Sequence, residues 1–181
     1  SNDSGREWSV ASDYTGLVKA EDRTAYAVGL PQQHRPGTVW AYNNAAVQTL
    51  DAVLVDATGQ RTARFAQDRL FAPLGMADTR LTPSGGGSTN LAFGMQSTCP
   101  DLARFGLLFA QGGRWEGRQV VSSAWVAAAT GAPSQRLNAA YGYLWWLNRE
   151  GTLRAPLDEI NGLGAPVDPT RGRLVPSAPP D

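Results

Sequence analysis

Three neighbouring side chains, Tyr42, Asn43 and Asn44, have the types and spacing that could do chemistry. They follow a Pro-Gly turn and stand directly before a helical apolar pattern. A phenol can pass a proton and a carboxamide can hold a carbonyl group, so the triplet could be part of an active site. A phenol with a pKa of about 10 is a poor base unless a cation beside it stabilises the phenolate. This interpretation therefore needs a lysine nearby, and Lys19 is the only one.

The same residues also fit a structural role. Either Asn43 or Asn44 could cap the following helix, while Trp40 and Tyr42 pack as a pair at its start. If Asn44 is only a cap, replacing it with Ala costs about 1 kcal/mol of stability and nothing else. The helix itself is predicted from an apolar stripe formed by Ala46, Val47, Leu50, Val53 and Leu54.

Other candidate nucleophiles are weaker. Ser84 and Ser88 lie in a glycine-rich loop without the G-x-S-x-G spacing of a nucleophile elbow. A Ser-His-Asp triad would require His34, which lies in a polar loop and is interpreted as a surface residue. Cys99 stands near a predicted helix start, where a thiol pKa can fall, but without a placed histidine we interpret it as a packing thiol.

Composition limits the class of protein. The chain has 181 residues, 42% hydrophobic and 18% charged, which predicts one globular domain. Basic and acidic residues number 16 each, so no net charge attracts nucleic acid. One cysteine and one histidine exclude an internal disulfide framework and a Cys/His zinc cluster, and we expect no cofactor. No apolar run is long enough to span a membrane.

The expected elements are mainly helical. We predict helices within 13–31, 44–58, 60–72, 98–111 and from 122 onward, an irregular segment over 76–96 with a flexible surface loop, and a buried strand near 141–148. Gly59 suits a left-handed helix end, Pro73 should end the second long helix, and Thr98 should cap the third. We expect a domain over 1–154 and an extended, Pro/Gly-rich segment over 155–181.

Four ordered segments resemble one family. "PGTVWAYNNAAVQTLDAVLVDATGQ" resembles the Y-x-N motif of serine hydrolases with the beta-lactamase fold. "LFAPLGMADTRL", "STCPDLARFGLLFAQGGRW" and "YGYLWW" are similar to later segments of the same family, in the same order. The branch that this sequence resembles includes class C beta-lactamases, family VIII esterases, D-alanyl-D-alanine carboxypeptidases and 6-aminohexanoate-dimer hydrolase. The similarity extends over about residues 14–148.

This resemblance implies an α+β fold that holds the helical region and part of the antiparallel sheet. It implies that Tyr42 is catalytic and that Asn44 positions the substrate carbonyl and a lysine. The reaction would cleave an ester, amide or beta-lactam through an acyl-serine intermediate. Many relatives act outside the cytoplasm, so a periplasmic or secreted parent protein is possible, although the chain contains no signal peptide.

The sequence departs from the family in two motifs. Gly16 stands three residues before Lys19, so the S-x-x-K motif of the nucleophile is missing, and neither K-T-G nor H-x-G is present. We therefore expect an internal fragment of a hydrolase that is inactive alone. Apolar surface left exposed would make it marginally stable or aggregation-prone, and a cooperative melt of a monomer would contradict this. Two alternatives are a non-catalytic binding module of the same family and an unrelated helical domain.

Overall fold

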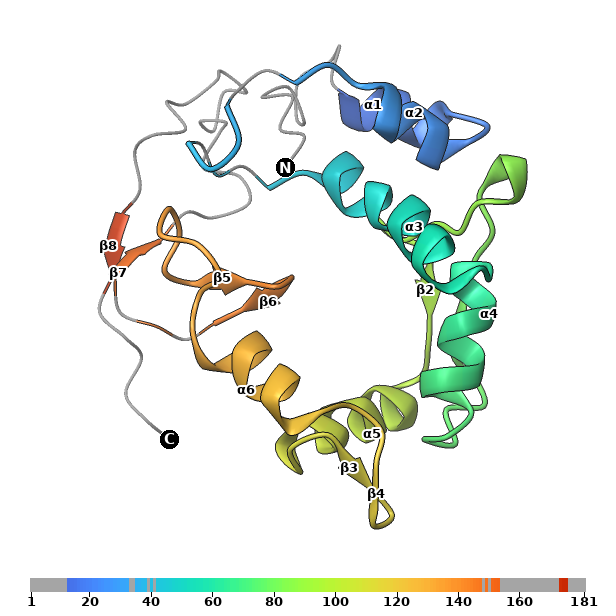
Figure 1. Cartoon of the computed structure of the whole chain (residues 1–181). Helices are drawn as coiled ribbons and strands as arrows, with labels where there is room; N and C mark the ends of the chain where they lie inside the picture. Colours follow the sequence, from blue (N-terminus) through green and yellow to red (C-terminus); the bar gives the residue numbers. More distant parts are fainter. Residues whose placement is uncertain are drawn as a thin grey trace.

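The computed structural model describes residues 13–32, 35–38, 40, 42–147, 149, 151–153 and 173–175. Helices alternate with short antiparallel ladders in this part of the chain, which gives an α+β fold as predicted. In Figure 1 the elements follow one another around an open ring, from the first two helices to the last hairpins. His34 and most of the 155–181 segment lie outside the described residues.

The described residues form helices, helical turns and antiparallel strand pairs. The helices are α1 (Asp13–Lys19), α2 (Arg23–Gly29), α3 (Asn44–Thr58), α4 (Thr62–Ala66), a π-helical turn η1 (Gln67–Phe71), a 3₁₀ turn η2 (Gly85–Gly87), α5 (Cys99–Ala110) and α6 (Ser123–Gly131). The antiparallel pairs are β1 (Arg80–Leu81) with β2 (Met95–Gln96), β3 (Arg114–Trp115) with β4 (Arg118–Gln119), β5 (Tyr141–Gly142) with β6 (Trp145–Trp146), and β7 (Gly151–Leu153) with β8 (Arg173–Val175). No helix among the described residues is long and apolar enough to cross a membrane.

Helix ends follow local side-chain chemistry. The Thr98 side chain accepts a hydrogen bond from Asp101 N at 3.5 Å, and this confirms the predicted cap of α5. The Ser122 side chain caps α6 in the same way. Gly59 has a φ of 66°, the left-handed conformation that commonly ends a helix, so the predicted end of α3 is confirmed.

The first helical region is divided in two. The sequence pattern predicts one helix within 13–31, but Asp22 interrupts it. The Asp22 carboxylate accepts hydrogen bonds from Thr24 N and Ala25 N, both at 3.0 Å, and so begins a second helix. The chain turns between α1 and α2, and the two helices lie together on one end of α3 (Figure 1).

The glycine-rich segment lies partly at the surface, as predicted, but it also packs against the rest of the fold. Ser84, Thr89 and Asn90 are buried, and the strands β1 and β2 close the segment at its ends. A Cβ at Gly85 would lie 2.0 Å from the carbonyl oxygen of Glu21. Glycine is therefore needed here for close packing against the α1–α2 turn rather than for mobility.

Residues 141–146 form a hairpin, whereas the sequence pattern predicts one buried strand near 141–148. Tyr143 and Leu144 have φ values of 48° and 69°, so the chain reverses through a two-residue turn. Their side chains are exposed. The apolar composition of this segment is that of a strand, and the pattern alone did not reveal the turn because neither central residue is glycine or asparagine.

The buried apolar core has two clusters. One contains Phe71, Leu74, Met76 and Leu108, between the η1 turn and α5. The other contains Leu17, Ala27 and Ala45, where α1 and α2 meet the start of α3.

Helix α3 is buried on its polar side. Gln48 and Asp51 are 0% and 2% exposed, whereas Leu50 and Val53 on the predicted apolar stripe are 37% and 59% exposed. Hydrogen bonds to α2 and to the 82–92 segment hold the buried side.

Candidate functional site

The candidate triplet lies at the start of α3. Asn43 has extended backbone angles, and its side-chain oxygen accepts a hydrogen bond from Ala46 N at 2.9 Å. The structure therefore selects Asn43 as the helix cap, and the interpretation of Asn44 as the cap is wrong. Asn44 is the first residue of the helix and is 8% exposed.

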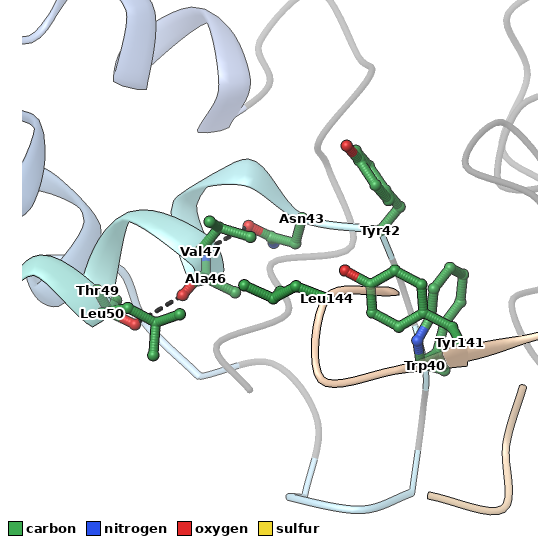
Figure 2. Close-up of a pocket in the computed structure, with 9 residues that line it drawn as sticks. All are labelled: Trp40, Tyr42, Asn43, Ala46, Val47, Thr49, Leu50, Tyr141 and Leu144. Carbon is green, nitrogen blue, oxygen red and sulfur yellow. Dashed lines mark hydrogen bonds between the residues drawn. The ribbon is translucent and has the colours of Figure 1, made fainter. Parts of the chain in front are cut away.

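Tyr42 lines a cavity of about 390 Å³. The cavity lies between the start of α3, the segment before it and the β5–β6 hairpin, as Figure 2 shows. Its lining comprises Trp40, Tyr42, Asn43, Ala46, Val47, Thr49, Leu50, Tyr141 and Leu144. The walls are mostly aromatic and aliphatic with a few polar atoms, which is the usual chemistry of a small-molecule site.

Four aromatic rings join the segment before α3 to the hairpin. The Tyr42 and Trp146 rings are stacked with centroids 6.3 Å apart, and Trp40 meets Tyr141 edge-to-face at 5.4 Å. Tyr141 also meets Trp146 edge-to-face at 5.0 Å. Pairs of this geometry contribute about 0.5–1.5 kcal/mol beyond their buried area. The rings therefore hold Tyr42 in place, and the predicted pairing of Trp40 with Tyr42 is replaced by contacts of both rings with the hairpin.

Tyr141 is a second phenol in the cavity wall. Burial raises the pKa of the Tyr141 phenol, and the charge of a Tyr42 phenolate would raise that pKa further. Tyr141 therefore remains protonated at neutral pH and can donate a hydrogen bond into the cavity. Figure 2 shows its hydroxyl directed toward Leu144, whereas the Tyr42 hydroxyl points away from it.

Sequence reasoning missed Tyr141 as a site residue. The signal was present, because "YGYLWW" is one of the segments that carry the family resemblance. The sequence pattern predicts that this segment is a single buried strand, and its aromatic rings are therefore interpreted as core packing residues. The hairpin turn instead brings Tyr141 and Leu144 to the same cavity as Tyr42.

The structure does not bring a cation to Tyr42. Within the described part of the chain, the Tyr42 ring stacks on Trp146 and its charge would act on Tyr141, but no lysine or arginine interacts with the Tyr42 side chain. Lys19 is exposed at the end of α1. Asn44 is buried beside the cavity but is not among the residues that line it.

The remaining candidate nucleophiles have structural contacts or lie at the surface. Ser84 Oγ accepts a hydrogen bond from Arg23 N at 3.1 Å, and Ser88 Oγ donates one to Asp22 at 2.7 Å. Cys99 is exposed as the first residue of α5, so its interpretation as a packing thiol is wrong. No group of three or more His, Cys, Asp and Glu side chains that could hold a metal ion occurs among the described residues.

Comparisons with known proteins give a consistent family. A family model described as Beta-lactamase matches residues 3–169. Three solved structures share the fold. A Bacillus anthracis protein assigned as a 6-aminohexanoate-dimer hydrolase matches with a TM-score of 0.58 and 21% identity over 68% of this chain and 33% of that one. A Bacteroides dorei protein assigned as a beta-lactamase matches with a TM-score of 0.54 and 22% identity over 77% of this chain and 40% of that one.

The third structure is an octameric penicillin-binding protein homologue from Pyrococcus abyssi, with a TM-score of 0.53 and 15% identity over 76% of this chain and 39% of that one. No curated protein sequence matches the chain. This chain spans between a third and two fifths of the length of the structures that it resembles. The family model nevertheless covers most of the chain, and the chain therefore belongs to the beta-lactamase family.

Proposed function

We propose that this chain forms the helical side of a serine hydrolase site that cleaves ester or amide bonds, with Tyr42 as a proton-transfer residue. The observation that carries the proposal is the position of Tyr42. Its ring lines an apolar cavity of about 390 Å³ and is held there by Trp146 and by the capped start of α3. Membership of the beta-lactamase family supports a small-molecule substrate.

In the proposed reaction, a serine oxygen attacks the carbonyl carbon of the substrate, and an acyl-serine forms as the bond to the leaving group breaks. The serine proton passes through a lysine and the Tyr42 phenol to the leaving oxygen or nitrogen. Water then attacks the acyl-serine and releases the acid. Two backbone N–H groups would stabilise each oxyanion, and such a donor is typically worth about 3 kcal/mol.

The chain supplies only part of this machinery. The S-x-x-K motif that would provide the serine and lysine, and the K-T-G or H-x-G motif, do not occur in the sequence. We propose that these motifs come from segments of the parent protein beyond this chain, with Asn44 positioning the substrate carbonyl and the lysine. The 181-residue chain alone is then expected to be inactive.

The cavity favours a substrate with an apolar portion beside the reacting carbonyl. Trp40, Val47 and Leu144 offer ring and methyl surface, while the Tyr141 hydroxyl offers one donor. Burying apolar substrate surface here stabilises the complex by about 25 cal/mol per Å². Simple esters, amides and beta-lactams all remain within this class.

The test is hydrolysis of nitrocefin and p-nitrophenyl esters by the longer protein encoded around this segment. Tyr42→Phe should lower kcat by at least about 100-fold, because general acid–base contributions are of that size. Tyr143→Phe is the matched control, since Tyr143 is exposed on the hairpin and packs on Trp125 outside the cavity. Equal kcat values for the Tyr42→Phe variant and the unmodified protein would refute the role of Tyr42. The proposal that the 181-residue chain is an incomplete site would be refuted if this chain alone hydrolysed substrate and Tyr42→Phe abolished that activity.

A non-catalytic binding module is the second candidate. It is favoured by one observation, that no lysine or arginine contacts the Tyr42 phenol within the described residues. Such a module would bind the same esters or beta-lactams in the cavity and release them unchanged. Binding of intact substrate without an acyl-protein adduct in mass spectrometry would select this function over hydrolysis.

A further inference from the structure

Three arginines line a second pocket, of about 370 Å³, formed by α4, β1 and the 83–89 segment. Arg61 immediately precedes α4, Arg64 lies within α4 and Arg80 begins β1. The other lining residues are Ala63, Gln67, Leu81, Pro83, Gly87, Ser88 and Thr89. The pocket thus combines guanidinium groups from two directions with an amide and two hydroxyls.

Two of the three guanidinium groups have no ion-pair partner among the described residues. Arg64 forms an ion pair with Asp68 at 2.7 Å. Arg61 and Arg80 form no ion pair with any residue that the structure describes. Asp22 is a second carboxylate near the rim, where it accepts a hydrogen bond from Ser88 Oγ at 2.7 Å while it caps α2. Bringing like charges together without counterions is unfavourable, so this wall is suited to an anion.

The floor of the pocket is fixed by Thr89, which is 3% exposed. Thr89 Oγ1 accepts a hydrogen bond from Ala63 N at 3.2 Å, and its backbone N–H donates to Asp51 at 3.1 Å. Its carbonyl accepts from Gln48 at 2.7 Å. No acceptor for the Thr89 hydroxyl proton occurs among the described residues, so this hydroxyl is available to donate to a ligand at the base of the pocket.

We propose that this pocket binds the phosphoryl group of a small molecule. A phosphate monoester carries a charge of about −1.5 to −2 at neutral pH, which is close in size to the combined charge of the Arg61 and Arg80 guanidinium groups. Planar guanidinium forks bind phosphate oxygens through paired hydrogen bonds, as lysine ammonium groups cannot. The Thr89 hydroxyl and the Gln67 amide provide neutral donors to the remaining oxygens.

The phosphoryl site is separate from the Tyr42 cavity. Tyr42 precedes the first residue of α3 and Arg61 follows its last turn. No residue lines both pockets, and Tyr42 and Arg61 stand on either side of α3 along the chain. Loss of phosphate binding can thus be distinguished from loss of the proposed hydrolase function.

The test is calorimetric titration of the 181-residue chain with inorganic phosphate, pyrophosphate and succinate at one fixed ionic strength. The double variant Arg61→Ala/Arg80→Ala should weaken phosphate and pyrophosphate binding by about 100-fold, roughly tenfold for each charged hydrogen-bond donor. Arg69→Ala/Arg118→Ala is the control, because it removes the same net charge from arginines that line a neighbouring pocket. That control should bind phosphate as the unmodified chain does.

Circular dichroism spectra should be the same for both double variants, because all four side chains are exposed and their truncation removes no buried contact. No detectable binding by the unmodified chain, or equal weakening in both double variants, would overturn the proposal. Succinate binding as tightly as phosphate would overturn the phosphoryl assignment in favour of a general dianion site.

Discussion

Replacement of Gln48 tests whether hydrogen bonds, rather than apolar packing, hold helix α3. The Gln48 side chain is fully buried and makes four hydrogen bonds. Its amide nitrogen donates to Thr24 Oγ1 at 2.8 Å and to Thr89 O at 2.7 Å. Its oxygen accepts from Leu91 N at 3.0 Å and Ala92 N at 3.3 Å. One side chain thus joins α2, α3 and the 82–92 segment.

The magnitude follows from these contacts. Gln48→Leu keeps most of the volume but removes all four bonds, each with a net value of about 1 kcal/mol, so the free energy of unfolding should fall by about 4 kcal/mol. Gln48→Ala leaves a cavity as well and should cost about 1 kcal/mol more. Small domains have total stabilities of about 5–15 kcal/mol, so either change is large for this chain.

Urea unfolding monitored by tryptophan fluorescence measures this loss as a shift of the transition midpoint at unchanged slope. Gln60→Leu is the control, because Gln60 is exposed after the end of α3 and should change stability by less than about 0.5 kcal/mol. A loss below about 1 kcal/mol in Gln48→Leu would refute the conclusion that the polar side of α3 fixes its position.

Three further outcomes are expected. Asn43→Ala should lower the free energy of unfolding by about 1 kcal/mol through loss of the cap, measured by urea unfolding beside Asn44→Ala, which does not remove that bond. Folding raises the pKa of Tyr141, so its stabilising contribution is complete below the unfolded pKa of about 10. This contribution is lost as the pH rises through the folded pKa. Alkaline unfolding should therefore begin at lower pH in the unmodified chain than in Tyr141→Phe. The hydrogen bond from Ala25 N, followed by that from Ser88 Oγ, lowers the pKa of Asp22. The contribution of Asp22 to folding stability is therefore present above about pH 3.9 and is lost as the pH falls through the folded pKa. An NMR titration should show the Asp22 pKa rising in Ser88→Ala.

Local sequence signals predicted the helices and several of their ends. Thr98 and Pro100 begin α5, Ser122 begins α6 and Gly59 ends α3 because each acts on backbone groups within one helical turn. The π-helical turn after α4 was not predicted, although the chain leaves helical structure before Pro73 as expected. An added residue in one turn leaves no clear mark on hydrophobic periodicity.

Signals that depend on distant residues were not readable from the sequence. The burial of Gln48 and Asp51 requires partners that lie about 25–45 residues away along the chain, including Thr24 and Thr89. The apolar pattern predicted that the opposite face of α3 is buried. Hydropathy reflects only the transfer of side chains out of water, and it does not include hydrogen bonds that form inside the protein. Tyr42 was predicted as a site residue from its resemblance to the family motif, whereas the place of Tyr141 in the same cavity depends on the hairpin geometry.

Because α3 buries its polar side, its tolerance to mutation should differ from that of most helices. In most helices of globular proteins, a saturation mutagenesis screen that selects for folded protein allows few substitutions at apolar positions and many at polar positions. Here the screen should give the opposite profile, because amide and carboxylate contacts are directional and Gln48 and Asp51 accept few replacements. Val53, on the exposed side, should accept polar residues readily. These buried hydrogen bonds fix the orientation of α3 about its own axis. Substitutions on the exposed side of α3 should therefore leave Tyr42 in its cavity.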